Sequence, residues 1–148
     1  MAGRPSRQRN SNAPHRAGGP SEIAPGVFVG SWRDAVEFEG TRFCVREEAP
    51  DDRFPATHIP IYDGSHDRAI VDQLDRLAES VSRARARGER VLVYCGHGVR
   101  RSPLAAAWYL HRAEQLSLAE AYARIEAVRP EVERARDWVG NPENLEET

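Results

Sequence analysis

The residues that could do chemistry are a cysteine and an arginine joined by a short loop that contains two glycines. Cys95, Gly96, Gly98, Arg101 and Ser102 lie in the single run CGHGVRRS. A thiolate is a strong nucleophile, and a guanidinium can hold two oxygens of a phosphoryl group at once. Backbone N–H groups of such a loop can surround an anion. The spacing therefore predicts a phosphate-binding loop that carries its own nucleophile.

The segments on either side of the loop favour the same interpretation. Residues 91–94 are apolar and strand-like, whereas Ser102 and Pro103 open a helical run with a capping hydroxyl and an early proline. The N-terminus of a helix attracts anions and favours thiolate over thiol. We expect the phosphate to contact the loop residues Gly96, His97, Gly98, Val99, Arg100 and Arg101.

This run and its flanks resemble the dual-specificity branch of the cysteine-dependent protein phosphatases, whose loop reads Cys-x-x-Gly-x-x-Arg-Ser. Cys95, Gly98, Arg101 and Ser102 occupy those four positions. The resemblance extends from about residue 22 to about residue 139. It includes a first strand at 23–31, a strand before the catalytic acid at 58–63, and a helix followed by an Arg-Pro turn at 118–130.

The resemblance implies hydrolysis through a phosphocysteine intermediate. In that mechanism Cys95 attacks phosphorus, Arg101 stabilises the charge, and Ser102 assists breakdown of the intermediate, although helix capping alone would also explain a serine there. Asp63 would be the general acid; the alternatives are a turn residue at this position and Asp67 as the acid. The implied substrate is a phosphorylated protein, with phosphotyrosine first and phosphoserine or phosphothreonine second, and the chemistry needs no cofactor and no metal.

Three residues depart from the family pattern. Tyr94 stands where a histidine is usual, and a phenol cannot carry positive charge near neutral pH. His97 and Arg100 are unusual within the loop. His97 either contacts a polyanionic substrate or only lends a backbone N–H, and Arg100 either adds positive potential at the rim of the pocket or is only solvated. The run from Cys95 to Gly98 is also similar to the Cys-x-His-Gly loops of relatives that act on RNA 5′ ends and phosphoinositides, so a phosphatase of such a phosphorylated polyanion is an alternative.

Two further classes of protein fit part of the pattern. Rhodanese-like sulfurtransferases have a Cys-x-x-Gly-x-Arg loop, which Cys95, Gly98 and Arg100 satisfy. That interpretation leaves Arg101 and Asp63 without a role. A phosphate-binding module without catalysis is the other alternative, and Tyr94 is the reason to keep it.

The pattern of elements predicts a single-domain α/β protein with a protein-tyrosine-phosphatase-like fold. We expect strands at 23–29, 41–46, 56–62 and 90–94, an amphipathic helix at 68–87, and helices starting at Ser102 and Ser117. The long helix connects two strands as in a βαβ unit, which favours a central mixed or parallel sheet flanked by helices. Asp63 and Cys95 would then lie at one edge of that sheet.

The chain's 148 residues allow one domain, which we place at 22–142 with a short C-terminal tail at 143–148. Residues 1–21 carry four arginines and no acid, and we expect a disordered basic tail, with a docking arm as the alternative. The net charge of -2 points to neither nucleic acid nor membrane. No apolar run suits a signal peptide or a membrane span, so we expect a cytoplasmic protein.

The remaining cysteine and the tryptophans suggest packing roles. Cys44 is expected to be a small core residue, with a reversible disulfide to Cys95 as the alternative if their strands are neighbours. Trp32, Trp108 and Trp138 are expected in the core or at its edge.

Overall fold

The fold is built around a five-stranded sheet whose central strand leads into the cysteine loop. The computed structural model describes residues 19–50, 53–62 and 69–135. The strands are β1 (Ser21–Ala24), β2 (Val27–Ser31), β3 (Thr41–Cys44), β4 (Thr57–His58) and β5 (Val91–Cys95). Their order is β1-β2-β5-β3-β4. β1 and β2 are antiparallel, whereas β5 is parallel to both of its neighbours, so the expected mixed sheet is confirmed.

Two of the expected strands differ in the structure. The segment 23–29 is not one strand, because the turn at Pro25 and Gly26, where Gly26 has φ 77°, splits it into the β1–β2 hairpin. Of the strand expected at 56–62, only Thr57 and His58 form β4, and Tyr62 makes an isolated bridge with Ala69. After β4, Ile59 and Ile61 are fully buried without belonging to a strand, so their apolar character reflects burial in the core.

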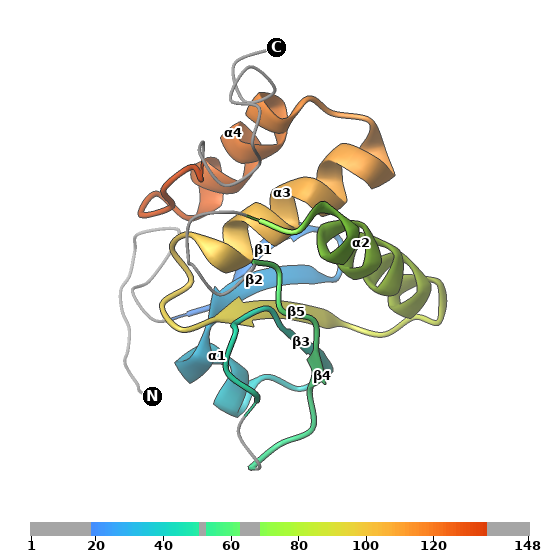
Figure 1. Ribbon diagram of the computed structural model, residues 1–148, viewed down its shortest axis with the longest axis vertical. Coiled ribbons are helices and arrows are strands. Elements are labelled where there is room, and N and C mark those ends of the chain that lie inside the picture. Colours follow the sequence, from blue (N-terminus) through green and yellow to red (C-terminus); the bar gives the residue numbers. More distant parts are fainter. Residues whose placement is uncertain (1–18, 51–52, 63–68, 136–148) are drawn as a thin grey trace.

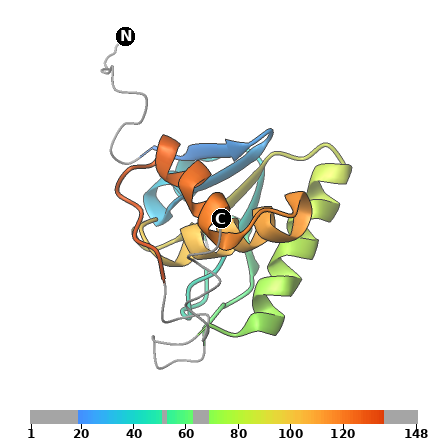
Figure 2. The ribbon, with the colours of Figure 1, turned by 90° about the horizontal axis from the view of Figure 1, so that it is seen from above.

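Within the described residues, three helices cover one face of the sheet and one short helix covers the other (Figures 1 and 2). The covering helices are α2 (Val71–Ala86), α3 (Arg101–Glu114) and α4 (Leu118–Val128), and α1 (Trp32–Glu37) lies on the opposite face. The side chains of β5 are buried on both faces. Val91, Val93 and Cys95 join the larger apolar cluster, while Leu92 and Tyr94 join a smaller one beneath α1.

The starts of α1 and α4 are fixed by capping boxes. Ser117 caps α4 together with Glu120, which confirms the expected capping box. α1 was not expected from the sequence, yet it begins with a capping box as well, in which Ser31 and Asp34 cap each other. This cap matters for the site, because α1 starts directly beside the end of β5.

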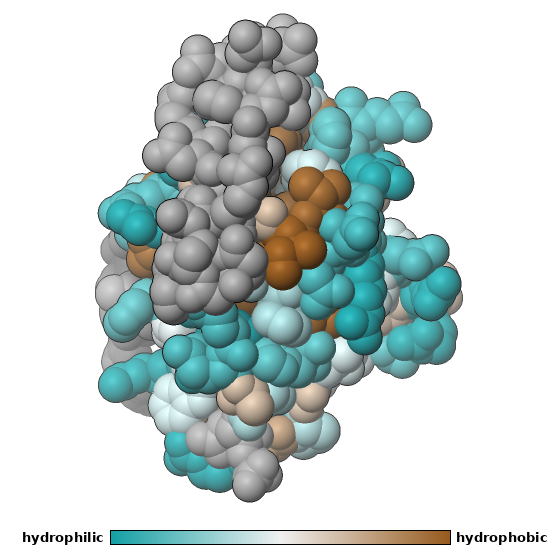
Figure 3. All heavy atoms as spheres, viewed as in Figure 1, coloured by the Kyte–Doolittle hydropathy of each residue, from teal (hydrophilic) through white to brown (hydrophobic). Residues whose placement is uncertain are grey.

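The surface in the view of Figure 3 is mostly hydrophilic, with apolar side chains gathered in one patch near its centre. Among the described residues the large hydrophobic side chains that are exposed are Val36 and Val71, at 38% and 44%. No helix in the described ranges combines the length and the apolar character needed to cross a bilayer.

The connection from β5 to α3 depends on Gly98. Its backbone has φ 73°, a left-handed conformation that disfavours side chains. A Cβ atom built there would lie 2.8 Å from the carbonyl carbon of Gly30. A Cβ atom built on Gly96, the other glycine of the loop, would have open space around it.

We therefore expect Gly98→Ala to destabilise the fold, by about 1–3 kcal/mol or more, because it adds both backbone strain and a clash with the β2 backbone. Gly96→Ala is the matched control, and it should change stability by less than about 1 kcal/mol. Urea unfolding of the two variants provides the measurement. Equal stabilities would contradict this account of the loop.

Candidate active site

Cys95 is the last residue of the central strand, and its sulfur receives hydrogen bonds from the loop that follows. The N–H of Gly98 donates to Cys95 Sγ at 3.2 Å, and the N–H of Ser102 donates to it at 3.4 Å. The hydroxyl oxygen of Ser102 lies 3.3 Å from the same sulfur. Donors that converge on sulfur stabilise its anionic form, and the start of α3 adds the positive end of a helix dipole.

The carbonyl groups of the loop are held away from the pocket by the surrounding scaffold. Gly96 O accepts from the N–H of Trp32 at 3.2 Å, and Val99 O accepts from the N–H of Glu133 at 2.9 Å. Gly98 O accepts from Nε of Arg129, also at 2.9 Å. Because C=O and N–H point in opposite directions across a trans peptide, these bonds turn the N–H of the next residue inward. The loop therefore presents donors to an anion.

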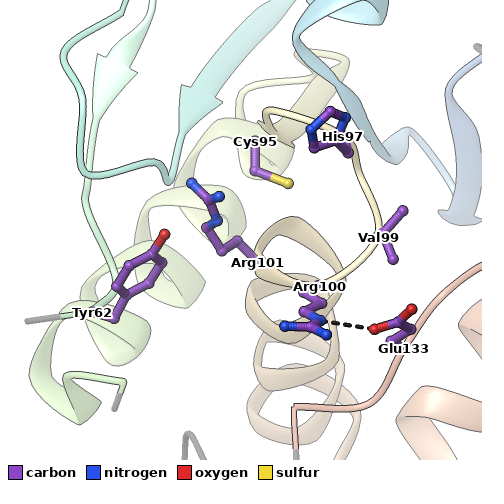
Figure 4. A pocket seen from close by; sticks show the side chains of 7 residues that line it. All are labelled: Tyr62, Cys95, His97, Val99, Arg100, Arg101 and Glu133. Carbon is purple, nitrogen blue, oxygen red and sulfur yellow. Dashed lines mark hydrogen bonds and ion pairs between the residues drawn. The ribbon is translucent and has the colours of Figure 1, made fainter. Parts of the chain in front are cut away.

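Arg101 lies on one wall of the pocket, beside Tyr62 (Figure 4). Its guanidinium carbon is 5.3 Å from the centre of the Tyr62 ring, and its Nη1 is 3.4 Å from Oε1 of Glu47. This ion pair uses one end of the guanidinium. The edge formed by Nε and Nη2 has the geometry that binds two oxygens of one phosphoryl group.

Tyr62 closes this wall as a neutral phenol. Burial and a hydrogen bond to Glu47 raise the pKa of Tyr62 well above its usual value, and the positive charge of Arg101 only partly opposes them. A neutral ring next to a guanidinium can stack on it without adding negative charge to an anion pocket. Tyr62 therefore gives the pocket an apolar side.

The opposite wall consists of Arg100 and Glu133, joined at 2.8 Å (Figure 4). Both side chains are more than half exposed, at 59% and 58%. His97 and Val99 also line this cavity, whose volume is about 380 Å³, and Cys95 lies in it with Arg101. Because Arg100 is solvated and paired at the rim, the geometry favours Arg101 over Arg100 as the partner of the cysteine.

The prediction that the Ser102 hydroxyl caps α3 is wrong. The helix begins at Arg101, the N-cap position is Arg100, and no side chain caps the helix there. The Ser102 hydroxyl instead donates to Gly30 O at 3.0 Å, which joins the start of α3 to β2. The physical reason is burial: Ser102 is completely buried, and a buried hydroxyl needs a partner, which the carbonyl of Gly30 supplies.

The side chain of Tyr94, which stands where the family has a histidine, points away from that of Cys95. Successive residues of a strand point to opposite faces, so Tyr94 packs in the smaller cluster with Cys44 and Phe54, whereas Cys95 faces α3. Burial, together with the neighbouring Cys44 thiol, raises the pKa of Tyr94, and the phenol stays neutral. The sulfur of Cys95 therefore depends on the backbone N–H groups described above.

Cys44 is fully buried, as expected, and both cysteines are free. Their strands are neighbours, as the disulfide alternative requires, but β3 and β5 pair Cys44 with Tyr94. Cys44 therefore projects from the opposite face of the sheet to Cys95. A bond between the two sulfurs would need the strands to rearrange, and the alternative is corrected on this ground.

Several sequence-based predictions lie outside the described residues. They concern Asp63 and Asp67, the two candidate acids, and Trp138. Trp108 is confirmed as part of the larger core cluster, and Trp32 packs against the smaller one. The described ranges contain no group of three or more histidine, cysteine or acidic residues placed to hold a metal.

Four residues at or beneath the pocket were not predicted as site residues: Glu47, Tyr62, Arg129 and Glu133. Glu47 and Tyr62 follow β3 and β4 at the edge where Cys95 lies, so their place in the topology was the available signal. Arg129 and Glu133 come from the segment after α4. This segment is about 30 residues from the loop in sequence and contacts it only through the tertiary fold, so no local pattern indicated it.

Comparison with known proteins identifies a family whose members share this fold. The family model for the dual specificity phosphatase catalytic domain matches residues 39–141. Human dual specificity phosphatase 28 is 31% identical over 121 residues, covering 75% of this chain and 68% of that protein. The crystal structure of human DUSP28 is similar with a TM-score of 0.60 and 27% identity, covering 78% of this chain and 84% of that chain.

Another relative is much longer than the region that it shares with this chain. Human dual specificity protein phosphatase 16 is 28% identical over 133 residues, which are 82% of this chain but only 20% of that protein. The similarity therefore concerns the catalytic domain. On the family match and the shared fold, the chain belongs to the dual specificity phosphatase family.

Proposed function

We propose that this chain hydrolyses phosphate monoesters of proteins through a phosphocysteine intermediate, with phosphotyrosine and phosphoserine or phosphothreonine as substrates. The observation that carries the proposal is the sulfur of Cys95, which receives the N–H groups of Gly98 and Ser102 in the same pocket as Arg101. Membership of the dual specificity phosphatase family supports this reaction.

In the first step the thiolate of Cys95 attacks phosphorus, and the bond between phosphorus and the leaving oxygen breaks. Asp63 gives its proton to that oxygen. Inward-facing N–H groups and Arg101 stabilise the charge on the remaining phosphoryl oxygens. In the second step Asp63, now ionised, takes a proton from water as the water attacks phosphorus. The sulfur–phosphorus bond breaks, and the single hydroxyl proton of Ser102 turns from Gly30 O to the sulfur 3.3 Å away, where it stabilises the departing thiolate.

A second candidate substrate is a polyanion with more than one phosphate. It is favoured by His97, which is exposed, and by Arg100, because both side chains line the same pocket as Cys95. A panel of phosphotyrosine and phosphothreonine peptides, a phosphoinositide and a 5′-triphosphate RNA compares the two substrate classes by kcat/KM. Preference for the last two would replace the protein substrate by a polyanion.

Cys95→Ser should lower hydrolysis by about 10⁴-fold or more, because a serine hydroxyl is a far weaker nucleophile than a thiolate. Binding of orthovanadate should be retained, since the N–H donors and Arg101 remain. Steady-state kinetics and vanadate titration measure the two properties. Substantial residual turnover would remove Cys95 from the mechanism.

Arg101→Lys should lower kcat/KM by about 10²- to 10³-fold, because an ammonium cannot bind two phosphoryl oxygens side by side. Arg100→Lys is the matched control at the rim and should stay within about fivefold of the wild type, the usual range for an exposed ion pair. The opposite order of losses would favour the sulfurtransferase alternative, and assay with thiosulfate and cyanide would then decide.

Asp63→Asn should slow hydrolysis of phosphotyrosine by about 10²- to 10⁴-fold, because the leaving oxygen then receives no proton from this residue. The loss should be much smaller for an activated aryl phosphate, whose leaving group needs little protonation. The basic limb of the rate against pH should also disappear in this variant. Asp67→Asn is the control, and the assignment passes to Asp67 if that variant shows this behaviour instead.

A further inference from the structure

Arg129 is the largest fully buried side chain of the described protein, with 1% of its surface exposed. It follows directly after α4 and extends beneath the phosphate-binding loop, where its Nε donates to Gly98 O at 2.9 Å. A buried guanidinium is costly unless its N–H groups are paired. Arg129 meets this condition through partners from three separate parts of the chain.

The second set of partners lies at the start of the sheet. Nη1 of Arg129 donates to Gly19 O at 2.8 Å and to the Ser21 hydroxyl oxygen at 3.0 Å. The carboxylates of Asp34 and Glu131 are 3.8 Å and 3.7 Å from the guanidinium nitrogens Nη2 and Nε. The side chain is therefore fixed at one end by the edge strand and by α1, and it can hold the loop at the other.

The bond to Gly98 O acts on both faces of the loop. Gly98 gives its own N–H to Cys95 Sγ, while its carbonyl is held by Arg129. The peptide that joins Gly98 to Val99 has its C=O turned toward Arg129, so its N–H points toward the opposite side, into the pocket. A bonded carbonyl also polarises its peptide and strengthens that N–H as a donor.

We propose that Arg129 is a positioning residue for phosphate binding: through Nε it holds the Gly98 carbonyl outward, which directs the Val99 N–H to the phosphoryl oxygens and the Gly98 N–H to the Cys95 sulfur. The inference rests on the proposed function. It assigns part of the anion affinity to a residue that touches neither the substrate nor the cysteine.

Two substitutions separate the hydrogen bond from the buried charge. In Arg129→Gln the amide nitrogen is attached to Cδ, the atom that carries Nε in arginine, so the donor to Gly98 O can be kept while the charge is lost. In Arg129→Lys a carbon takes the place of Nε, so the charge is kept while the donor at that point is lost. The proposal predicts that glutamine preserves the loop better than lysine.

The experiment measures orthovanadate affinity and, separately, kcat and KM for a phosphotyrosine peptide. Arg129→Lys should weaken vanadate binding and lower kcat/KM by about 10²-fold, the effect of a small displacement of binding groups. Arg129→Gln should lose about fivefold or less, the scale of an ordinary hydrogen bond. Ile125→Val, which trims a buried α4 side chain that Gly98 does not use, is the stability control and should keep wild-type vanadate affinity.

Three outcomes would overturn the positioning role. They are equal losses in the two Arg129 variants, a larger loss in glutamine than in lysine, and an equal loss in Ile125→Val at matched thermal stability. If neither Arg129 variant folds, NMR of the wild type decides. The Nε–H of Arg129 must then be protected from solvent exchange and must shift when vanadate is added; a rapidly exchanging or unmoved signal rejects the role.

The test also distinguishes this inference from the proposed function. Vanadate binding and the Arg129 NMR signal report on the loop whether or not the protein hydrolyses phosphopeptides. A wild type that binds vanadate without turnover would refute the proposed function and leave the positioning role standing. Normal turnover by the wild type, together with wild-type vanadate affinity and kcat/KM in Arg129→Lys, would refute the positioning role and leave the proposed function standing.

Discussion

The site depends on the orientation of consecutive peptide groups in one short loop. Each peptide can offer a pocket either its C=O or its N–H, and an anion needs the N–H. The protein fixes this choice from outside, since α1, Arg129 and the segment after α4 each bind one loop carbonyl. Without those bonds the same residues would present a mixture of donors and acceptors. These tertiary hydrogen bonds therefore make the side of the loop that faces the pocket electropositive.

The two arginines at the pocket are also held in place by neighbouring side chains. Arg101 approaches the pocket between Glu47 and the ring of Tyr62, so its guanidinium is held before any anion arrives. A pre-positioned cation loses less conformational entropy on binding than a free one. At the rim, Arg100 is paired with Glu133 and exposed, where solvent screens its charge. The inner arginine and the rim arginine therefore serve the pocket to different degrees, although they are adjacent in sequence.

Sheet geometry keeps the two cysteines in separate environments. Cys95 faces α3 and its N–H donors, while Cys44 and Tyr94 share the apolar cluster beneath α1. Burial is the largest of the influences that raise the pKa of Cys44, which favours its neutral thiol. The replacement of a histidine by Tyr94 fits this cluster, because a neutral phenol can pack there as an aromatic ring. The support that a charged neighbour would give the nucleophile falls to the backbone instead.

The sequence by itself determined the family, the mixed sheet, the capping box at Ser117 and the shared pocket of Cys95 and Arg101, because these are encoded in local runs of residues. It could not assign the Ser102 hydroxyl to Gly30, nor bring Glu47, Tyr62 and Arg129 to the loop. It also allowed a disulfide between Cys44 and Cys95 as an alternative, which the register of β3 and β5 disfavours. These contacts join segments far apart in the chain, and only the packing of strands and helices sets which of them meet. Local pattern specifies the loop, whereas tertiary hydrogen bonds decide which way its peptides face.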